Sequence, residues 1–111
     1  MKLTDLSRQE QLALGGLLRM LIRADGDFTE AEEEKLNALG ESLGGSDLLW
    51  KVISDSAQAF ANDAAITEAA AQVERADVRE LIASTLDSLA ASDGVDAKEA
   101  ALVASLRAKW A

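Results

Sequence analysis

The spacing of the apolar residues constrains this chain most, because it follows the period of an α-helix in segment after segment. Between Val78 and Leu89, apolar side chains recur at intervals of three and four residues and so share one helix face. No segment sustains the alternation of apolar and polar residues that is typical of a half-buried strand. Proline, which breaks helices, does not occur. The sequence therefore predicts an all-α fold without strands.

Helix start and stop signals divide the chain into about six to seven helices. Ser7 and Glu10 are spaced as a capping box, in which each side chain accepts a hydrogen bond from the backbone N–H of the other residue. Gly44 and Gly45 are expected to end the second helix, because glycine readily adopts a left-handed conformation. The expected helices cover Arg8–Asp25, the segment after Thr29, a segment capped by Ser46, Ile66–Val73, a segment capped by Asp77, and the segment after Asp96.

Length and composition predict a single domain over residues 1–111, built as a helical bundle with short loops. Apolar residues make up 49% of the chain, enough for a buried core. Gly15 and Gly16 fall inside the first expected helix, where two interior glycines cost about 2 kcal/mol relative to alanine. Either another helix approaches the backbone closely at this point, or the helix kinks near a functional site.

Missing residue types exclude several kinds of chemistry. The chain has no cysteine and no histidine, which excludes thiol nucleophiles, disulfides, zinc-finger ligand sets and imidazole acid–base catalysis. Because a glycine-rich phosphate loop is also missing, we expect no enzymatic activity. The net charge of −9 would repel nucleic acid. No apolar run reaches the roughly 18 residues of a membrane-spanning helix, and no secretory signal is recognisable. We therefore expect a cytoplasmic protein without membrane insertion.

A short motif occurs twice in the chain. In each copy an apolar helix and a small residue lead into Asp-Gly, an apolar residue, a helix-capping residue and, three positions after the cap, a glutamate. The two aspartates lie about 70 residues apart, which suggests two halves related by a pseudo-twofold axis. The copies are Ala24-Asp25-Gly26-Asp27-Phe28-Thr29-Glu30-Ala31-Glu32 and Ser92-Asp93-Gly94-Val95-Asp96-Ala97-Lys98-Glu99.

Each copy also concentrates carboxylates. An aspartate in the last turn of a helix faces the negative end of the helix dipole at a cost of about 0.3–1 kcal/mol, so Asp25 and Asp93 need compensation. Amides of the next turn could supply it, as could the basic side chains Arg19 and Arg23. If the two turns lie side by side, the alternative is a divalent cation with oxygen ligands, Ca or Mg rather than Zn. The candidate metal ligands are Asp25, Asp27, Glu32, Asp93, Asp96 and Glu99.

With these paired motifs the chain resembles the TerB-like family, which comprises the tellurite resistance protein TerB and its relatives. The resemblance extends from about Ser7 to Trp110, with Ser92 at a position where the family pattern has alanine. It implies an all-helical fold with internal pseudo-symmetry and an acidic surface that chelates a divalent cation. It also implies a role in tellurite or other chemical stress, or as an interaction module. The acidic positions that match the family are Asp25, Glu32, Asp93 and Glu99.

Two function hypotheses follow from the residues and the resemblance. The first is a non-catalytic stress-response protein that binds a divalent cation through its acidic Asp-Gly turns. The alternative is an adaptor that recognises a basic protein partner without metal, since a charge of −9 would steer such a partner. Trp50 and Trp110 are then candidate contact residues, although both also continue apolar helix faces and could simply pack. A second copy of the chain is one form that the partner could take.

Overall fold

The computed structural model describes residues 1–24, 29–90 and 97–110. For residues 24 and 97–100 the description covers the backbone alone. This part of the chain contains no strand, and the prediction of an all-α bundle is confirmed. Its elements are the 3₁₀-helix η1 (Leu3–Asp5) and the helices α1 (Arg8–Ala24), α2 (Glu30–Ser42), α3 (Ser46–Ala59), α4 (Asp63–Ala71), α5 (Ala76–Ala90) and α6 (Ala97–Trp110).

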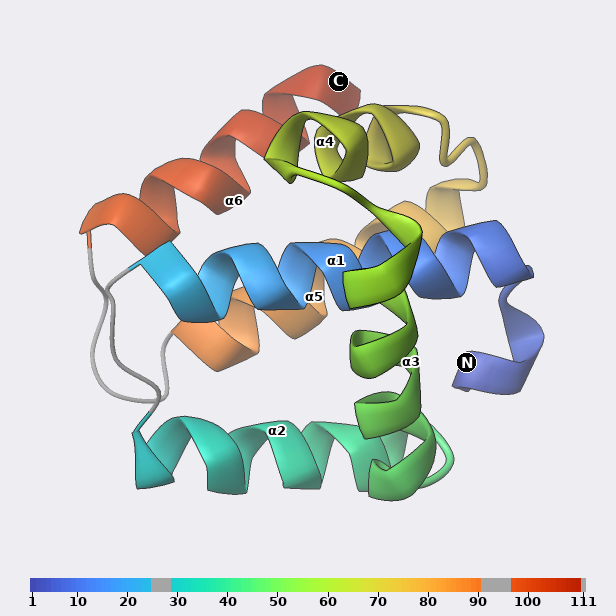
Figure 1. Cartoon of the computed structure of the whole chain (residues 1–111), viewed down its shortest axis with the longest axis vertical. Coiled ribbons are helices and arrows are strands. Elements are labelled where there is room, and N and C mark those ends of the chain that lie inside the picture. The colour runs from blue at the N-terminus through green and yellow to red at the C-terminus, as the bar shows by residue number, and fades with distance from the viewer. Residues whose placement is uncertain (25–28, 91–96, 111) are drawn as a thin grey trace.

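Helix α1 is the centre of the bundle (Figure 1). It packs against α3, α4, α5 and α6, whereas α2 packs against α3 and α5. Helix α3 crosses α1. Helices α2 and α4 lie on opposite sides of α1 (Figure 1). The molecule measures 30 × 28 × 26 Å, with a radius of gyration of 12.6 Å. No helix in the described residues has both the length and the apolar character to cross a membrane.

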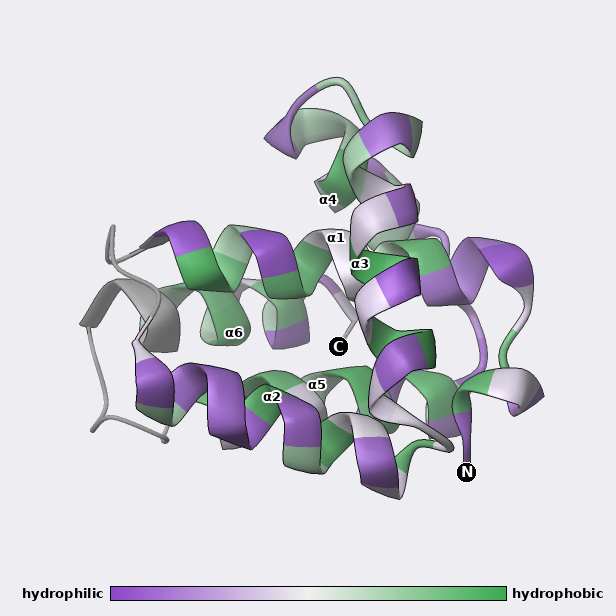
Figure 2. Ribbon diagram, turned by 60° about the horizontal axis from the view of Figure 1, so that its bottom comes forward, coloured by the Kyte–Doolittle hydropathy of each residue, from purple (hydrophilic) through white to green (hydrophobic). Residues whose placement is uncertain are grey.

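The apolar faces predicted from the spacing form the core. Figure 2 shows hydrophobic residues turned toward the middle of the molecule and hydrophilic ones outward, most clearly along α2. On α1 the spacing predicts that Leu14, Leu17, Leu18, Leu21 and Ile22 face inward. The four leucines are buried and Ile22 is half-buried. On α3 the apolar spacing predicts that Ala57 faces inward with Ile53, but Ala57 is exposed, so this prediction is wrong. The largest fully buried apolar side chains are Leu3, Leu14, Leu18, Leu21, Leu36, Leu49, Ile66, Ile82, Leu86, Leu89 and Val52.

Two predicted helix starts are wrong by a few residues. Helix α3 begins at Ser46 itself, and Gly45 takes the capping position. Helix α4 begins at Asp63, earlier than predicted, because the side-chain oxygen of Asn62 accepts a hydrogen bond from the backbone N–H of Ala65 (2.9 Å) and caps it.

The start of α5 also differs from the prediction. The helix begins at Ala76, so Asp77 lies in its first turn and does not occupy the capping position. There its carboxylate accepts a hydrogen bond from the backbone N–H of Val78 (2.9 Å). The end predicted for the second helix is confirmed, since Gly44 and Gly45 have φ angles of +116° and +145°.

The glycines of α1 lie where two other helices approach its backbone. A Cβ atom on Gly15 would lie 2.8 Å from the carbonyl oxygen of Val52 in α3, and one on Gly16 would lie 2.9 Å from Cγ2 of Ile66 in α4. Helix α1 continues through this point. Of the two interpretations of the glycine pair, close helix approach is therefore the one that the structure bears out.

The predicted capping box at the start of α1 is present and extends into a long-range ion pair. The backbone N–H of Ser7 donates to Oε1 of Glu10 (2.7 Å), and the backbone N–H of Glu10 donates to Oγ of Ser7 (3.2 Å). Arg75, which precedes α5, donates from Nε and Nη2 to the same carboxylate (3.0 and 2.8 Å) and from Nη2 to the carbonyl oxygen of Asp5 (2.9 Å). These bonds hold the pKa of Glu10 down at about 2.

Replacing Gly15 by alanine tests the close approach. Helix propensity alone would make the change stabilising by about 1 kcal/mol. The contact with the Val52 carbonyl predicts the opposite sign, a loss of about 1–3 kcal/mol in the free energy of unfolding. Urea denaturation measures it, and Ala64→Gly on the exposed surface of α4 reports the propensity term by itself. A stabilised Gly15→Ala variant would contradict the packing described.

The Glu10 ion pair predicts how stability depends on pH. Because the pKa of Glu10 is lowered to about 2 in the folded chain, its stabilising effect is complete above pH 4.5 and is lost as the pH falls toward 2. Glu10→Gln should therefore cost about 1–3 kcal/mol at pH 7 and progressively less below pH 4.5. Urea titrations at pH 7 and pH 3 measure this, with Glu33→Gln on the exposed face of α2 as the control. An equal cost at both pH values would contradict the role of the ion pair.

Candidate functional site

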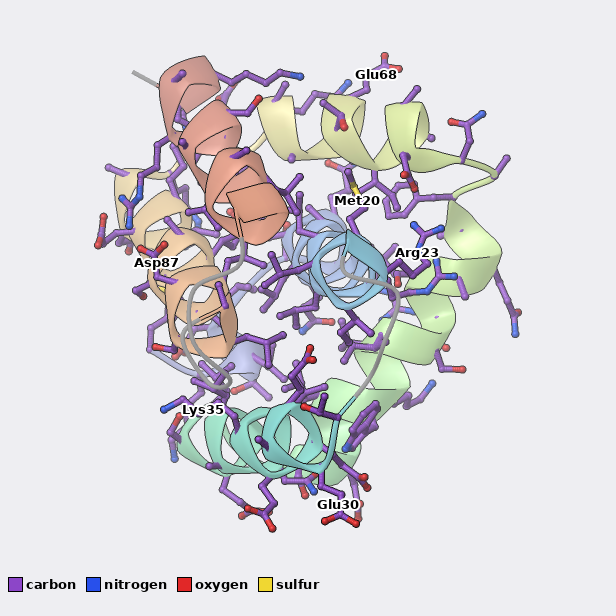
Figure 3. All side chains as sticks on the ribbon, turned by 90° about the vertical axis from the view of Figure 1, so that its left-hand side faces the viewer. Met20, Arg23, Glu30, Lys35, Glu68 and Asp87 are labelled. Carbon is purple, nitrogen blue, oxygen red and sulfur yellow. The ribbon has the colours of Figure 1, made fainter. Side chains whose placement is uncertain are left out.

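Four helix ends that flank the two acidic motifs lie on one side of the molecule. They are the C-terminal ends of α1 and α5 and the N-terminal ends of α2 and α6 (Figure 1). In Figure 3, which looks at this side, Arg23 of α1, Glu30 of α2 and Asp87 of α5 surround the same end of the bundle. We call it the motif end. The topology thus brings together helix ends that are far apart in the sequence.

The candidate metal ligands fall into three groups. The carboxylates of Asp25, Asp27, Asp93 and Asp96 lie outside the described residues. Glu99 belongs to the first turn of α6, and its side chain also lies outside the description. The side chain of Glu32 belongs to the described residues.

Glu32 is a carboxylate buried in the bundle at the motif end. It lies in the first turn of α2 and is 2% exposed. Its backbone N–H donates to Oγ1 of Thr29 (3.1 Å), and the Thr29 hydroxyl donates to Oε1 of Glu32 (3.4 Å). Thr29 is therefore the N-cap that the sequence predicted. An acid so deeply buried costs free energy unless hydrogen bonds or positive charge compensate it.

The other acids of α2 behave differently. Glu30, Glu33 and Glu34 are exposed, as expected for a solvated first turn that faces away from the core. Only the glutamate in the motif position points inward. Among the described side chains, no group of three or more acids is arranged to hold a metal ion.

Arg23 at the motif end and Arg107 in the last turn of α6 bind acids of neighbouring helices. Arg23 donates from Nη2 to Oδ1 of Asp63 in α4 (2.5 Å), an acid that lies outside both motifs. Arg107 of α6 donates to Oδ2 of Asp87 in α5 (2.6 Å), and this contact raises the pKa of the guanidinium. These two guanidinium groups therefore compensate Asp63 and Asp87.

A cavity that the sequence did not predict lies at the opposite end of α1. It has a volume of about 500 Å³ and lies between the start of α1, the end of α4 and the residues that follow α4. The Glu10–Arg75 ion pair forms part of its wall. No local sequence pattern predicts this ion pair, because Glu10 and Arg75 are 65 positions apart in the sequence. The residues that line the cavity are Ser7, Gln9, Glu10, Ala69, Gln72, Val73, Glu74 and Arg75.

Both tryptophans pack within the bundle, and each indole N–H has a partner. Nε1 of Trp50 donates to Oδ1 of Asn37 across the α2–α3 contact (2.7 Å). Nε1 of Trp110 donates to the carbonyl oxygen of Ala70 at the end of α4 (2.9 Å). Their half-buried positions against the core support packing over an exposed contact surface.

Comparison of the chain with models of protein families, with curated proteins and with solved structures gives no match. The resemblance to the TerB-like family therefore stays a prediction from the two motifs.

Proposed function

We propose that this chain is a non-catalytic, TerB-like module that binds a divalent cation at the motif end and acts in a stress response. The observation that supports this most is Glu32, the buried acid of the first motif, beside helix ends that lead into both acidic segments. The two motifs supply further carboxylates by sequence, Asp25 and Asp27 before α2 and Asp93 and Asp96 before α6.

The chemistry of these groups suits a hard cation. Carboxylate oxygens are the preferred ligands of Ca and Mg, whereas Zn favours the sulfur and nitrogen ligands that this chain lacks. The partial negative charge at the C-terminal ends of α1 and α5 is offset by the partial positive charge at the N-terminal ends of α2 and α6, so the attraction for a cation comes from the carboxylates. A cation there would offset the repulsion among the carboxylates of the two motifs. The cation would then join the two halves of the fold.

A basic protein partner is the second candidate function. It is favoured by the exposed acids on the outer face of α2, which point into solvent. Such a surface would accelerate association with a positively charged protein and would lose this effect in salt. It would need no metal.

Calorimetric titration with Ca, Mg, Mn and Zn tests the cation site. The wild type should bind Ca or Mg, and at a hundred times the Kd the free energy of unfolding should rise by about 2.7 kcal/mol over its value in EDTA. Asp25→Asn/Asp93→Asn should abolish both effects and be more stable than the wild type in EDTA, because a repulsion has been removed. Glu32→Gln should also lose metal-dependent stabilisation.

The matched control removes the same charge from the outer face of α2. Glu33→Gln/Glu34→Gln should bind the metal as the wild type does, since both side chains are exposed. Absence of heat with all four metals at millimolar concentration, with unchanged stability, would refute the cation site. An equal loss of metal binding in both double variants would mean that only the net charge of the chain matters. That result would also refute the cation site.

A further inference from the structure

Helix α6 is a basic helix that lies on an acidic part of the bundle. It carries three basic residues, Lys98, Arg107 and Lys109, and one acidic residue, Glu99. Helix α4 has two acidic and no basic residues, and α5 has three acidic residues and one basic. Helix α6 contacts both of these helices as well as α1. The excess positive charge of α6 therefore faces an excess of negative charge on α4 and α5.

The apolar attachment of α6 is shallow. Val103 and Leu106 are its buried side chains among residues 101–110, each 4% exposed, while Leu102 and Trp110 are half-buried. Helix α5, by comparison, contributes seven buried residues. The core formed by α1, α3 and α5 therefore keeps most of its members without α6. Elements with few buried contacts are those that open locally below the free energy of global unfolding.

Helix α6 packs on an apolar surface of α1. Leu17 and Met20 of α1 line a pocket of about 40 Å³ together with Leu102 and Leu106 of α6. Met20 projects from α1 toward α4, and Thr67 of α4 closes the pocket on that side (Figure 3). Apolar residues at helical spacing on α6 thus fit between α1 and α4, as an amphipathic helix does in a groove.

Polar contacts near the C-terminal end of α6 fasten it to α4 and α5. The indole N–H of Trp110 donates to the carbonyl oxygen of Ala70, and the guanidinium of Arg79 lies 5.9 Å from the centre of the indole ring. Arg107 binds Asp87 of α5. We call the contacts of Trp110 and Arg107 the latch. They also include a 3.4 Å hydrogen bond from Arg79 to the carbonyl oxygen of Trp110 and a 3.7 Å ion pair between Arg107 and Glu80. The Arg107 ion pairs are exposed to solvent, so salt weakens them.

We propose that α6 is the internal occupant of a groove that binds basic amphipathic helices, and that a helix of this kind in a partner protein displaces it. The incoming helix would place its apolar residues on Leu17 and Met20 and its basic residues beside the acids of α5. Because only molecules with α6 displaced can bind the partner, the apparent Kd equals the intrinsic Kd divided by the open fraction. The proposal does not depend on the cation site.

A labelled peptide with the sequence of residues 97–110 tests the groove against the full chain. Fluorescence anisotropy should show that Trp110→Ala, which removes the main latch contact, binds the peptide at least about tenfold more tightly than the wild type. A peptide with Arg107→Glu and Lys109→Glu should bind at least about tenfold more weakly than the native peptide. Trp50→Ala is the matched control, because it removes an indole from the α2–α3 contact and should leave the affinity at the wild-type value.

Hydrogen exchange of the same proteins separates opening of α6 from general destabilisation. In Trp110→Ala the amides of residues 101–110 should exchange at least about tenfold faster, while those of α1 and α5 stay protected. Arg107→Ala is a milder second variant that should show the same pattern if Trp110→Ala fails to fold. The proposal is overturned if α6 amides exchange together with those of α5, if the peptide does not bind the opened variant, or if Trp50→Ala gains equal affinity.

Discussion

The close contact between α1 and the helices that cross it determines the arrangement of this molecule. Without Cβ atoms at Gly15 and Gly16, α3 and α4 reach the α1 backbone, and the side chain of Ile66 and the carbonyl of Val52 occupy the space. Because these helices pack so near its middle, α1 becomes a central axis with two distinct ends. The cost of glycine in a helix interior is offset by the packing that it permits.

The acidic side chains at the two ends of α1 differ in number and in their partners. At the N-terminal end, Arg75 binds Glu10 with two nitrogen atoms and holds its pKa low, so this acid is compensated within the chain. Arg23 at the motif end binds Asp63, and Arg107 in the last turn of α6 binds Asp87. At the motif end, the sequence places further aspartates in both acidic motifs. This difference is the physical reason for placing a cation at the motif end in our proposal.

Sequence reasoning predicted the helices well, because each is set by local signals. Capping residues, apolar spacing and the Gly44–Gly45 pair can all be recognised within a few positions. The errors at Ser46, Asp63 and Asp77 are shifts of a helix start by one to three residues. The reason for the glycine pair in α1 could be stated beforehand only as two alternatives. Choosing between them needed the position of α3, which depends on contacts between distant segments.

The candidate site could be predicted only in part. Thr29 as the N-cap three residues before Glu32 was predicted from the motif, whereas the burial of the Glu32 side chain was not. The Glu10–Arg75 pair, the cavity beside it and the packing of α6 on α1 could not be predicted, because each joins residues from different helices. Single-sequence patterns describe how one helix is built, whereas these features depend on how helices meet.

A paramagnetic titration tests the central claim that the motif end binds the cation. In the ¹H–¹⁵N spectrum of the folded chain, substoichiometric Mn²⁺ broadens resonances near its binding site. The account predicts that the amides of Thr29, Glu32 and Ala90 broaden first, while those of Ser7 and Arg75 at the other end of α1 remain sharp. Broadening that instead follows the exposed acids of α2, or that affects both ends of α1 equally, would contradict it.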